Sequence, residues 1–228
     1  MRKILILFVI LAFSGIPALA QKPTPILEIL KRIDAHRKAL KSLTANITIA
    51  KFSVSFGGNY IKEGAIKFLP GKTDYSLRMD STKPATELFL IVNGQYVLYQ
   101  PNPDEIYFPS PKSAFTGKLT DSQKNTLVIF SMLTTGIIKT DYAKILYLGQ
   151  EKVNTTPVWH LALTPKTVSG YETLELWVDG NGMLIRSKIV ENKSEATTVF
   201  LESLQKNIKM KVTEFKASLP KGTDIIKN

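Results

Sequence analysis

The feature that most constrains the fold of this chain is a series of short segments in which apolar and polar residues alternate. In one of them, Tyr75, Leu77 and Met79 are separated by single polar residues, as in a strand with one buried and one solvated face. Two others are joined by Asn93-Gly94, the pair preferred in two-residue hairpin turns. Sequential strands joined by short turns indicate an antiparallel sheet, and a sheet of about ten strands tends to curl or close.

The strands predicted from this pattern cover residues 44–56, Tyr60–Leu69, Thr73–Met79, Glu87–Val92, Gln95–Gln100, Glu105–Pro109, Lys144–Leu148, Pro157–Thr164, Tyr171–Asp179, Met183–Glu191, Thr197–Leu204 and Ile208–Phe215. In the first of them the apolar positions change parity between Ile49 and Phe52. This change predicts a β-bulge near Ala50-Lys51.

Two segments show a helical pattern instead. Pro25–Leu43 starts with proline, which suits the first helical position, and carries an apolar stripe opposite a basic face. A second helix is predicted over Thr126–Leu133, preceded by Asp121 as a cap and ended by Gly136. Ser110–Leu119 is predicted to be a loop.

Residues 1–20 have the organisation of a secretory signal peptide. Arg2 and Lys3 precede an apolar run of about ten residues, and Ala18-Leu19-Ala20 forms a small-residue cleavage site. A membrane anchor is the alternative, but this run is shorter than the ~20 apolar residues that span a bilayer. The chain also lacks a cysteine for lipidation. We therefore expect cleavage after Ala20 and export to the periplasm as a single unanchored domain, residues 21–228.

The composition argues against catalysis and metal binding. The absence of cysteine excludes thiolate nucleophiles and disulfides, and the two histidines, His36 and His160, are both predicted to face solvent. There is no G-x-S-x-G, H-E-x-x-H or phosphate-binding loop motif. We therefore predict a protein that is not an enzyme, with no catalytic residue, no cofactor and no metal.

The positive charge of the chain narrows the class of partner. Thirty Lys and Arg residues against 19 Asp and Glu give a formal net charge of +11, which favours acidic partners such as nucleic acid, anionic lipid or an acidic protein. The basic residues are spread along the chain and are not gathered with aromatic residues in one stripe. We therefore expect transient contact with a membrane surface and no nucleic-acid partner.

Three segments are apolar on both parities, namely residues 88–92, 96–99 and 106–108. A sheet that is apolar on both faces must be covered twice, or must present one face to a ligand. A curved sheet closed by a helix would hold such a ligand in a cavity. A core on both sides of the sheet is the alternative, and periodicity alone leaves both open.

Several short stretches recur in the order and spacing of a known family. They are Glu63-Gly64 before Ala65–Leu69, Pro70 and Tyr75; Val92–Gln95 leading through Tyr96–Tyr99 to Gln100-Pro101; Leu163–Lys166; Leu174–Val178 with Asp179-Gly180 and the strand to Ile189; and Leu219–Thr223. Together they resemble the LolA family of periplasmic lipoprotein carriers, in the LolA/LolB-like superfamily. The resemblance covers nearly all of the chain after residue 20.

This resemblance implies a mainly β fold with helices, an unclosed antiparallel β-barrel (half-barrel) with an α-helical lid over an apolar cavity. It implies a monomeric carrier, without cofactor or reaction, that shields the acyl chains of lipoproteins. Its partners would be acylated lipoproteins, an inner-membrane ABC transporter and an outer-membrane acceptor. The residues expected to line the lipid-binding cavity are Leu27, Leu30, Ile33, Leu40, Ile66, Phe68, Tyr75, Leu77, Met79, Leu90, Val92, Leu98, Phe130, Leu133, Leu161, Leu163, Leu176 and Val178.

One position departs from the family pattern. The family usually has an arginine before the proline that follows the second strand, and this arginine latches the lid. Here Leu69 precedes Pro70, so Lys67, Lys72 and Arg78 are the candidates for a latch. A second function therefore stays open: a LolA-like domain that binds another lipid or acts as a regulatory or sensor module.

Overall fold

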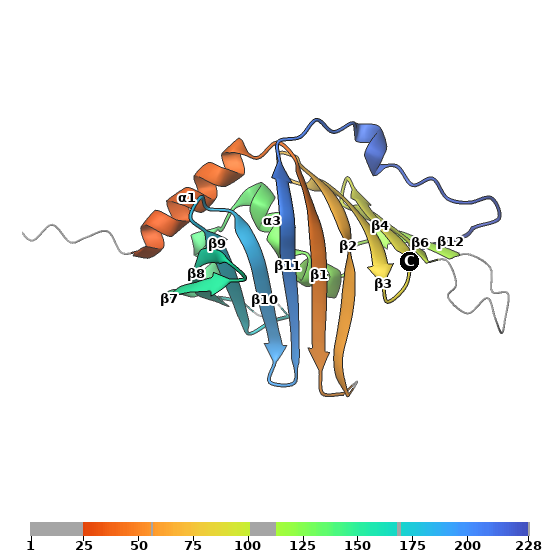
Figure 1. The fold of residues 1–228 in the computed structure, drawn as a ribbon. Coiled ribbons are helices and arrows are strands. Elements are labelled where there is room, and N and C mark those ends of the chain that lie inside the picture. Colours follow the sequence, from red (N-terminus) through yellow and green to blue (C-terminus); the bar gives the residue numbers. More distant parts are fainter. Residues whose placement is uncertain (1–24, 56, 101–112, 168–169, 228) are drawn as a thin grey trace, which may run out of the picture.

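The computed structural model describes residues 25–55, 57–100, 113–167 and 170–227, and its dominant feature is one large curved sheet (Figure 1). The sheet has 12 strands in the spatial order β12-β6-β5-β4-β3-β2-β1-β11-β10-β9-β8-β7. The pair β12–β6 is parallel and the other neighbours pair antiparallel. Because β12 and β7 are the two edges of this order, the sheet is unclosed, which confirms the predicted fold class.

The strands are β1 (Leu43–Ser53), β2 (Gly58–Pro70), β3 (Tyr75–Lys83), β4 (Glu87–Val92), β5 (Gln95–Gln100), β6 (Ser113–Lys118), β7 (Tyr142–Val153), β8 (Thr156–Pro165), β9 (Thr173–Asp179), β10 (Leu184–Asn192), β11 (Glu195–Lys206) and β12 (Asp224–Lys227). The helices are α1 (Pro25–Ala39), α2 (Asp121–Thr126) and α3 (Val128–Thr135), with short 3-10 helices η1 (Lys139–Asp141) and η2 (Val212–Phe215).

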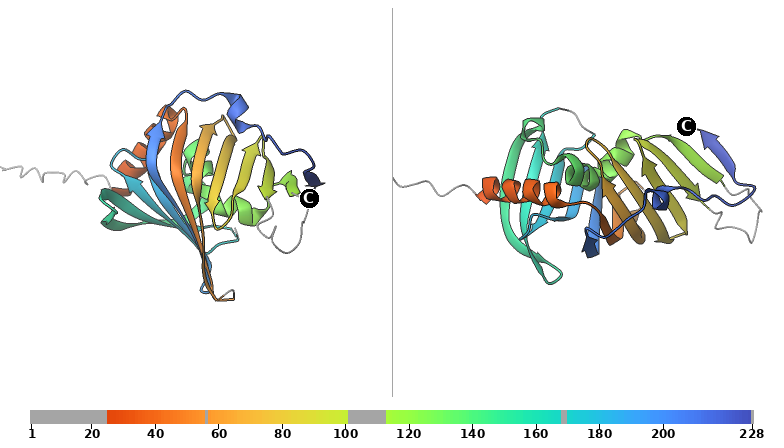
Figure 2. Two further views of the ribbon diagram at one scale, coloured as in Figure 1. Left: turned by 45° about the vertical axis from the view of Figure 1, so that its right-hand side comes forward. Right: turned by 90° about the horizontal axis from the view of Figure 1, so that it is seen from above.

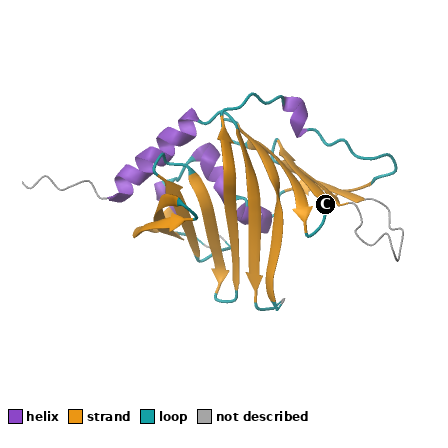
Figure 3. Ribbon diagram, in the orientation of Figure 1, coloured by secondary structure: helices purple, strands orange, loops and turns teal. Residues whose placement is uncertain are grey.

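The sheet bends around α3, which places the core on its concave face. Helix α3 contacts β2 and β3 on one side of the central strands and β10 on the other. Figures 2 and 3 show α2 and α3 on the same side of the sheet, with α1 along its rim. The concave face of the sheet and the apolar face of α3 therefore bury each other, as a sheet with one apolar face requires.

Alternation along the strands selects which side chains enter this core. Leu77 and Met79 are buried and Tyr75 packs against the core, while the residues between them lie on the opposite face, as predicted. Phe130 of α3 meets Phe68 and Tyr75, with ring centroids 5.4 Å and 6.3 Å away. Such tilted aromatic pairs add to the stability that burial provides. The aromatic cluster fastens α3 to β2 and β3.

The helices differ from the prediction at their ends. Helix α1 stops at Ala39 and not at Leu43, because Leu43 already pairs with Phe68 in the sheet. Thr120, not Asp121, is the N-cap of α2: its hydroxyl accepts a hydrogen bond from the Gln123 backbone in a capping box. The predicted helix Thr126–Leu133 corresponds to α3, and Gly136 ends it as expected. Helix α2, which meets α3 at Leu127, was not predicted.

The predicted bulge lies elsewhere in the first strand. β1 keeps one parity throughout, with Ile47 and Ile49 buried and Phe52 42% exposed. Its register shift lies between Thr44 and Asn46, opposite β11. Phe52 pairs with Asn59 near the end of the β1–β2 hairpin, and this hairpin extends away from the helices (Figure 1). Its apolar character therefore did not indicate burial, and the predicted bulge near Ala50-Lys51 was wrong.

The C-terminal part of the chain is the other departure. Residues Ile208–Phe215 form a loop and η2 instead of a strand, and the segment predicted to be a loop contains β6. The last described strand, β12, pairs with β6. This pairing joins segments more than a hundred residues apart, so it has no local signature in the sequence.

The C-terminal segment explains why some strands are apolar on both faces. η2 packs against β3 and β4 on the convex face. Phe215 of η2 is 3% exposed, and Leu90 and Ala114, which lie on the convex face of β4 and β6, are also buried. These three residues are not part of the concave core cluster. The sheet is therefore covered twice in this region.

Two predicted segments lie outside the described residues: the signal peptide 1–20 and the strand Glu105–Pro109. Of the helices in the described part of the chain, none combines the length and apolar character that crossing a bilayer requires.

Candidate functional site

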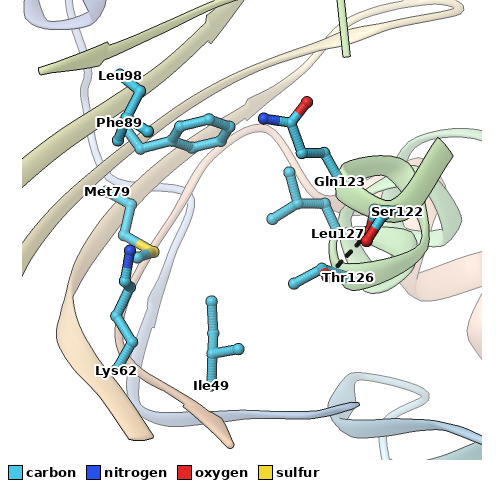
Figure 4. Close-up of a pocket in the computed structure, with 9 residues that line it drawn as sticks. All are labelled: Ile49, Lys62, Met79, Phe89, Leu98, Ser122, Gln123, Thr126 and Leu127. Carbon is cyan, nitrogen blue, oxygen red and sulfur yellow. Dashed lines mark hydrogen bonds between the residues drawn. The ribbon is translucent and has the colours of Figure 1, made fainter. Parts of the chain in front are cut away.

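A pocket opens between the concave face of the sheet and α2 (Figure 4). Its sheet side consists of Ile49, Met79, Phe89 and Leu98, each from a different strand, and Leu127 faces them from the end of α2. The cavity has a volume of about 200 Å³, which is smaller than the ~300 Å³ at which sites for drug-sized ligands usually begin. The rest of the lining is polar and comprises Lys62, Ser122, Gln123 and Thr126.

An ion pair lies beside this apolar wall. Lys62 Nζ donates a hydrogen bond to Glu87 Oε2, and the two side chains are only 19% and 10% exposed. Gln100 Nε2 donates to the other oxygen of Glu87 at 2.9 Å. Lys62 and Met79 both line the pocket on its sheet side (Figure 4). The pocket thus combines an apolar wall with one charge-balanced polar group.

Helix α3 is held in place by contacts with α1 and with the sheet. Arg37 of α1 donates to the Thr134 carbonyl of α3 at 3.1 Å. Tyr75 of β3 packs against Phe130 of α3, with ring centroids 6.3 Å apart, and burial of the phenol raises the pKa of Tyr75 to about 12. Tyr75 therefore stays neutral at physiological pH. These two contacts tie α3 to α1 and to the sheet.

Only two of the predicted cavity residues, Met79 and Leu98, line the pocket under α2. Others on the concave face belong to the packed core: Leu40, Ile66, Phe68, Tyr75, Leu77, Phe130, Leu133, Leu161, Leu163, Leu176 and Val178. Leu27, Leu30 and Ile33 border a second cavity, between α1 and residues 135–139, whose lining includes Lys31, Asp34 and Lys139. Much of the predicted cavity is therefore filled by side chains.

Leu90 and Val92 were assigned to the wrong face. Leu90 pairs with Arg78, and Ile91 pairs with Leu77. Ile91 and Phe89 therefore face the concave core, while Leu90 and Val92 lie on the convex face. The error has a physical cause: residues 88–92 are all apolar, so their pattern does not distinguish the two faces. Phe89, a pocket residue, was missed for the same reason.

The remaining pocket residues also lacked a sequence signal. Lys62 is a charged residue in a strand, and such a residue normally faces solvent. Ser122, Gln123 and Thr126 belong to α2, a short polar helix with no buried residue of its own. Only the position of Leu127 between the two helices brings this polar segment against the apolar wall.

The candidate latch residues do not contact α3. Lys67 Nζ pairs with Glu214 at 2.6 Å, and Arg78 pairs with Asp80 at 2.8 Å and donates to the Glu214 carbonyl at 3.3 Å. Lys72 is exposed in the turn between β2 and β3. Lys67 and Arg78 therefore hold the C-terminal segment on the convex face, and the role of fastening α3 falls to Arg37 and Tyr75.

His160 is more enclosed than predicted. It lies on the convex face as expected, but its ring stacks on Trp177 with centroids 4.2 Å apart and contacts Glu175 at 2.9 Å. The guanidinium of Arg186 covers the same indole ring, 4.3 Å from its centroid. Among the described residues, no group of three or more acidic or histidine side chains is arranged to hold a metal ion. This stack covers the convex face of β8–β10.

Comparisons with known proteins give structural matches alone. No family model matches the chain, and no curated protein matches it. Solved structures with a similar fold include a crystal structure of MucB, 14% identical with a TM-score of 0.51, over 88% of this chain and 64% of that chain. The chain spans 59–64% of the length of the MucB chains that it matches.

Two further structures match with lower TM-scores. The Pseudomonas aeruginosa MucA/MucB complex is 14% identical with a TM-score of 0.47, over 84% of this chain and 61% of that chain. A LolA superfamily protein from Nitrosomonas europaea is 16% identical with a TM-score of 0.41, over 84% of this chain and 97% of that chain. At these identities the similarity concerns the fold alone.

Proposed function

We propose that this protein binds an acyl chain in the pocket under α2 and carries it through the periplasm. The observation that supports this most directly is the wall of Ile49, Met79, Phe89 and Leu98, which is open to a ligand although most of the concave face is packed. Each methylene that leaves water contributes about 0.8 kcal/mol. The several methylenes of an acyl chain that such a pocket covers therefore gain enough from this wall to be held during transfer.

The physiological cargo that we propose is an acylated lipoprotein. The protein would receive it from an inner-membrane ABC transporter and deliver it to an outer-membrane acceptor, after export and cleavage behind Ala20. Cleavage removes Arg2 and Lys3 and lowers the net charge from +11 to +9, and this remaining positive charge favours transient contact with anionic membrane surfaces on this route. No catalytic step is part of the proposal.

A pocket-filling variant tests acyl binding. Leu98→Trp should reduce the affinity for a fluorescent fatty-acyl probe by about tenfold or more, because the indole occupies the volume that the chain needs. Leu98 is only partly buried, so the fold should survive, which a melting curve verifies. Leu148→Trp is the matched control, since Leu148 is 52% exposed on β7. The proposal is contradicted if the native protein takes up no probe, or if Leu98→Trp and Leu148→Trp bind the probe equally well.

A second candidate function is binding of a protein partner in a regulatory complex. It is favoured by the exposed apolar side chains towards the end of the β1–β2 hairpin, where Phe52, Val54, Tyr60 and Ile61 are 42–62% exposed and the pairing places Phe52 and Ile61 on the same face. MucB, which shares the fold, forms a complex with MucA(peri). Two results together would support this second function. The native protein would take up no acyl probe, and the double variant Phe52→Ser/Ile61→Ser would lose a partner protein that co-purifies with the native protein.

A further inference from the structure

The ion pair Lys62–Glu87 is unusual because it lies on the apolar concave face, where apolar side chains would pack equally well. It lies on the concave face, beside the apolar residues Met79 and Phe89. A buried ion pair is weak evidence for stability, since well-packed apolar residues of similar volume often stabilise a protein as much or more. In small-molecule sites, by contrast, a few polar groups in an apolar pocket fix the orientation of the ligand. The pair is therefore a candidate for the part of the pocket that meets the polar end of a ligand.

The charge of the site restricts that polar end. Lys62 and Glu87 neutralise each other, and Gln100 supplies a neutral donor to the carboxylate. A free carboxylate entering this place would add a negative charge without a counter-ion, which is costly where water is partly excluded. A neutral group that accepts hydrogen bonds would leave the charge balance intact.

Donors for such a neutral group are present. An ammonium has three N–H groups, so Lys62 can hold Glu87 and also donate to a ligand oxygen. Gln123 accepts a hydrogen bond from the Thr120 backbone through Oε1 at 2.8 Å, and its amide nitrogen points into the pocket towards Phe89 (Figure 4). A carbonyl oxygen in the pocket would therefore find a donor on either wall, Lys62 on the sheet or Gln123 on α2.

We infer that the pocket selects acyl chains whose carbonyl belongs to an ester or an amide over the same chains ending in a free carboxylate. This inference rests on the proposed acyl binding and names the class of ligand. Lys62 donates to the carbonyl oxygen, and Glu87 repels a carboxylate while it balances Lys62. The apolar wall holds the chain without regard to its end group.

The test compares two probes with the same fluorescent chain, one a free acid and one its methyl ester, at pH 8, where the acid is ionised. The protein with its native pocket should bind the ester about tenfold more tightly or better. Glu87→Gln leaves Lys62 without a counter-ion and should shift the preference towards the acid. Lys62→Met/Glu87→Met should abolish the preference and keep binding of the chain.

A matched control separates the pocket from ion pairs in general. Lys83 and Glu63 form an exposed pair at 2.8 Å between β2 and β3, away from the pocket lining. Glu63→Met/Lys83→Met should keep the preference for the ester, and melting curves should verify that every variant is folded.

The outcomes separate this inference from the proposed function. Equal binding of the two probes by the native pocket, or tighter binding of the acid, overturns the inference and leaves acyl binding standing. The same holds if the Lys62/Glu87 double variant keeps the preference for the ester. Failure of both probes to bind overturns the proposed function and the inference together.

Discussion

His36 shows, at the scale of single residues, how a polar side chain on a helix becomes buried by segments that come later in the chain. It lies between Ala35 and Arg37 in α1, yet its Nε2 atom is inaccessible and has no hydrogen-bond partner among the described residues. Burial, together with the charge of Lys206, lowers the pKa of His36 below its usual value of 6.5. The folded protein therefore holds this ring neutral at pH values where the unfolded chain protonates it.

We expect the free energy of unfolding to depend on pH through His36. Because its pKa is lower in the folded state, the unfolded state binds more protons as the pH falls below about 6.5, and stability decreases there. Above that pH the ring is neutral in both states and contributes no pH dependence. Asp34 is charged throughout this range, since its pairs with Lys38 and Arg37 lower its pKa.

Urea unfolding of the native protein and of His36→Gln at pH 7.5, 6.5 and 5.5 measures this effect. The native protein should lose more stability than the variant between pH 6.5 and 5.5, and the two should change in parallel above pH 7. A native curve and a variant curve that stay parallel down to pH 5.5 would show that His36 is not buried as described.

At the scale of elements, the turn between β9 and β10 fixes the position of α1. Gly182 has φ of +85°, and a Cβ placed on it would come within 2.2 Å of the Arg32 carbonyl oxygen. Arg32 in turn donates to the Gly180 carbonyl at 2.9 Å and covers Trp159. The turn and the helix backbone are therefore in direct contact, and only glycine fits at this point.

Gly182→Ala should destabilise the protein by about 2–4 kcal/mol, since it combines an unfavourable backbone conformation with overpacking against α1. Gly180→Ala is the control in the same turn. A Cβ at Gly180 meets no atom within 4 Å, so this change should cost less than about 0.5 kcal/mol. Thermal unfolding of both variants decides the matter, and equal melting temperatures would mean that α1 does not dock on this turn.

The elements also show how far sequence reasoning reaches. β3 alternates cleanly, so the face of Leu77 was predicted correctly, and Asn93-Gly94 correctly marked the β4–β5 hairpin. β4 is apolar on both faces, so the face of Leu90 depended on a C-terminal segment more than a hundred residues away. Lys62 was missed because its burial depends on its distant partner Glu87, and no local pattern records such pairing.

On the scale of the whole molecule, the sheet separates two apolar regions with different roles. The concave region contains the core around α3 and the pocket under α2. The convex region lies under the C-terminal segment, which crosses the sheet from β11 to β12 (Figure 1). Glu214 ties this segment to Lys67, and Phe215 is buried beneath it. Because the two regions lie on opposite faces, stability and ligand binding can be changed separately.

Phe215→Ala tests this separation. Loss of a buried aromatic side chain should cost about 3 kcal/mol of unfolding free energy, while Phe215→Leu, which keeps most of the volume, should cost less than about 1.5 kcal/mol. Neither change reaches the pocket on the concave face, so both variants should bind the fluorescent acyl probe with unchanged affinity at a temperature where they are folded. Unfolding curves in urea and probe titrations on the same preparations measure both quantities. A Phe215→Ala variant as stable as the native protein would mean that the C-terminal segment does not cover the sheet, and a large loss of probe affinity in the folded variant would mean that the two faces are coupled.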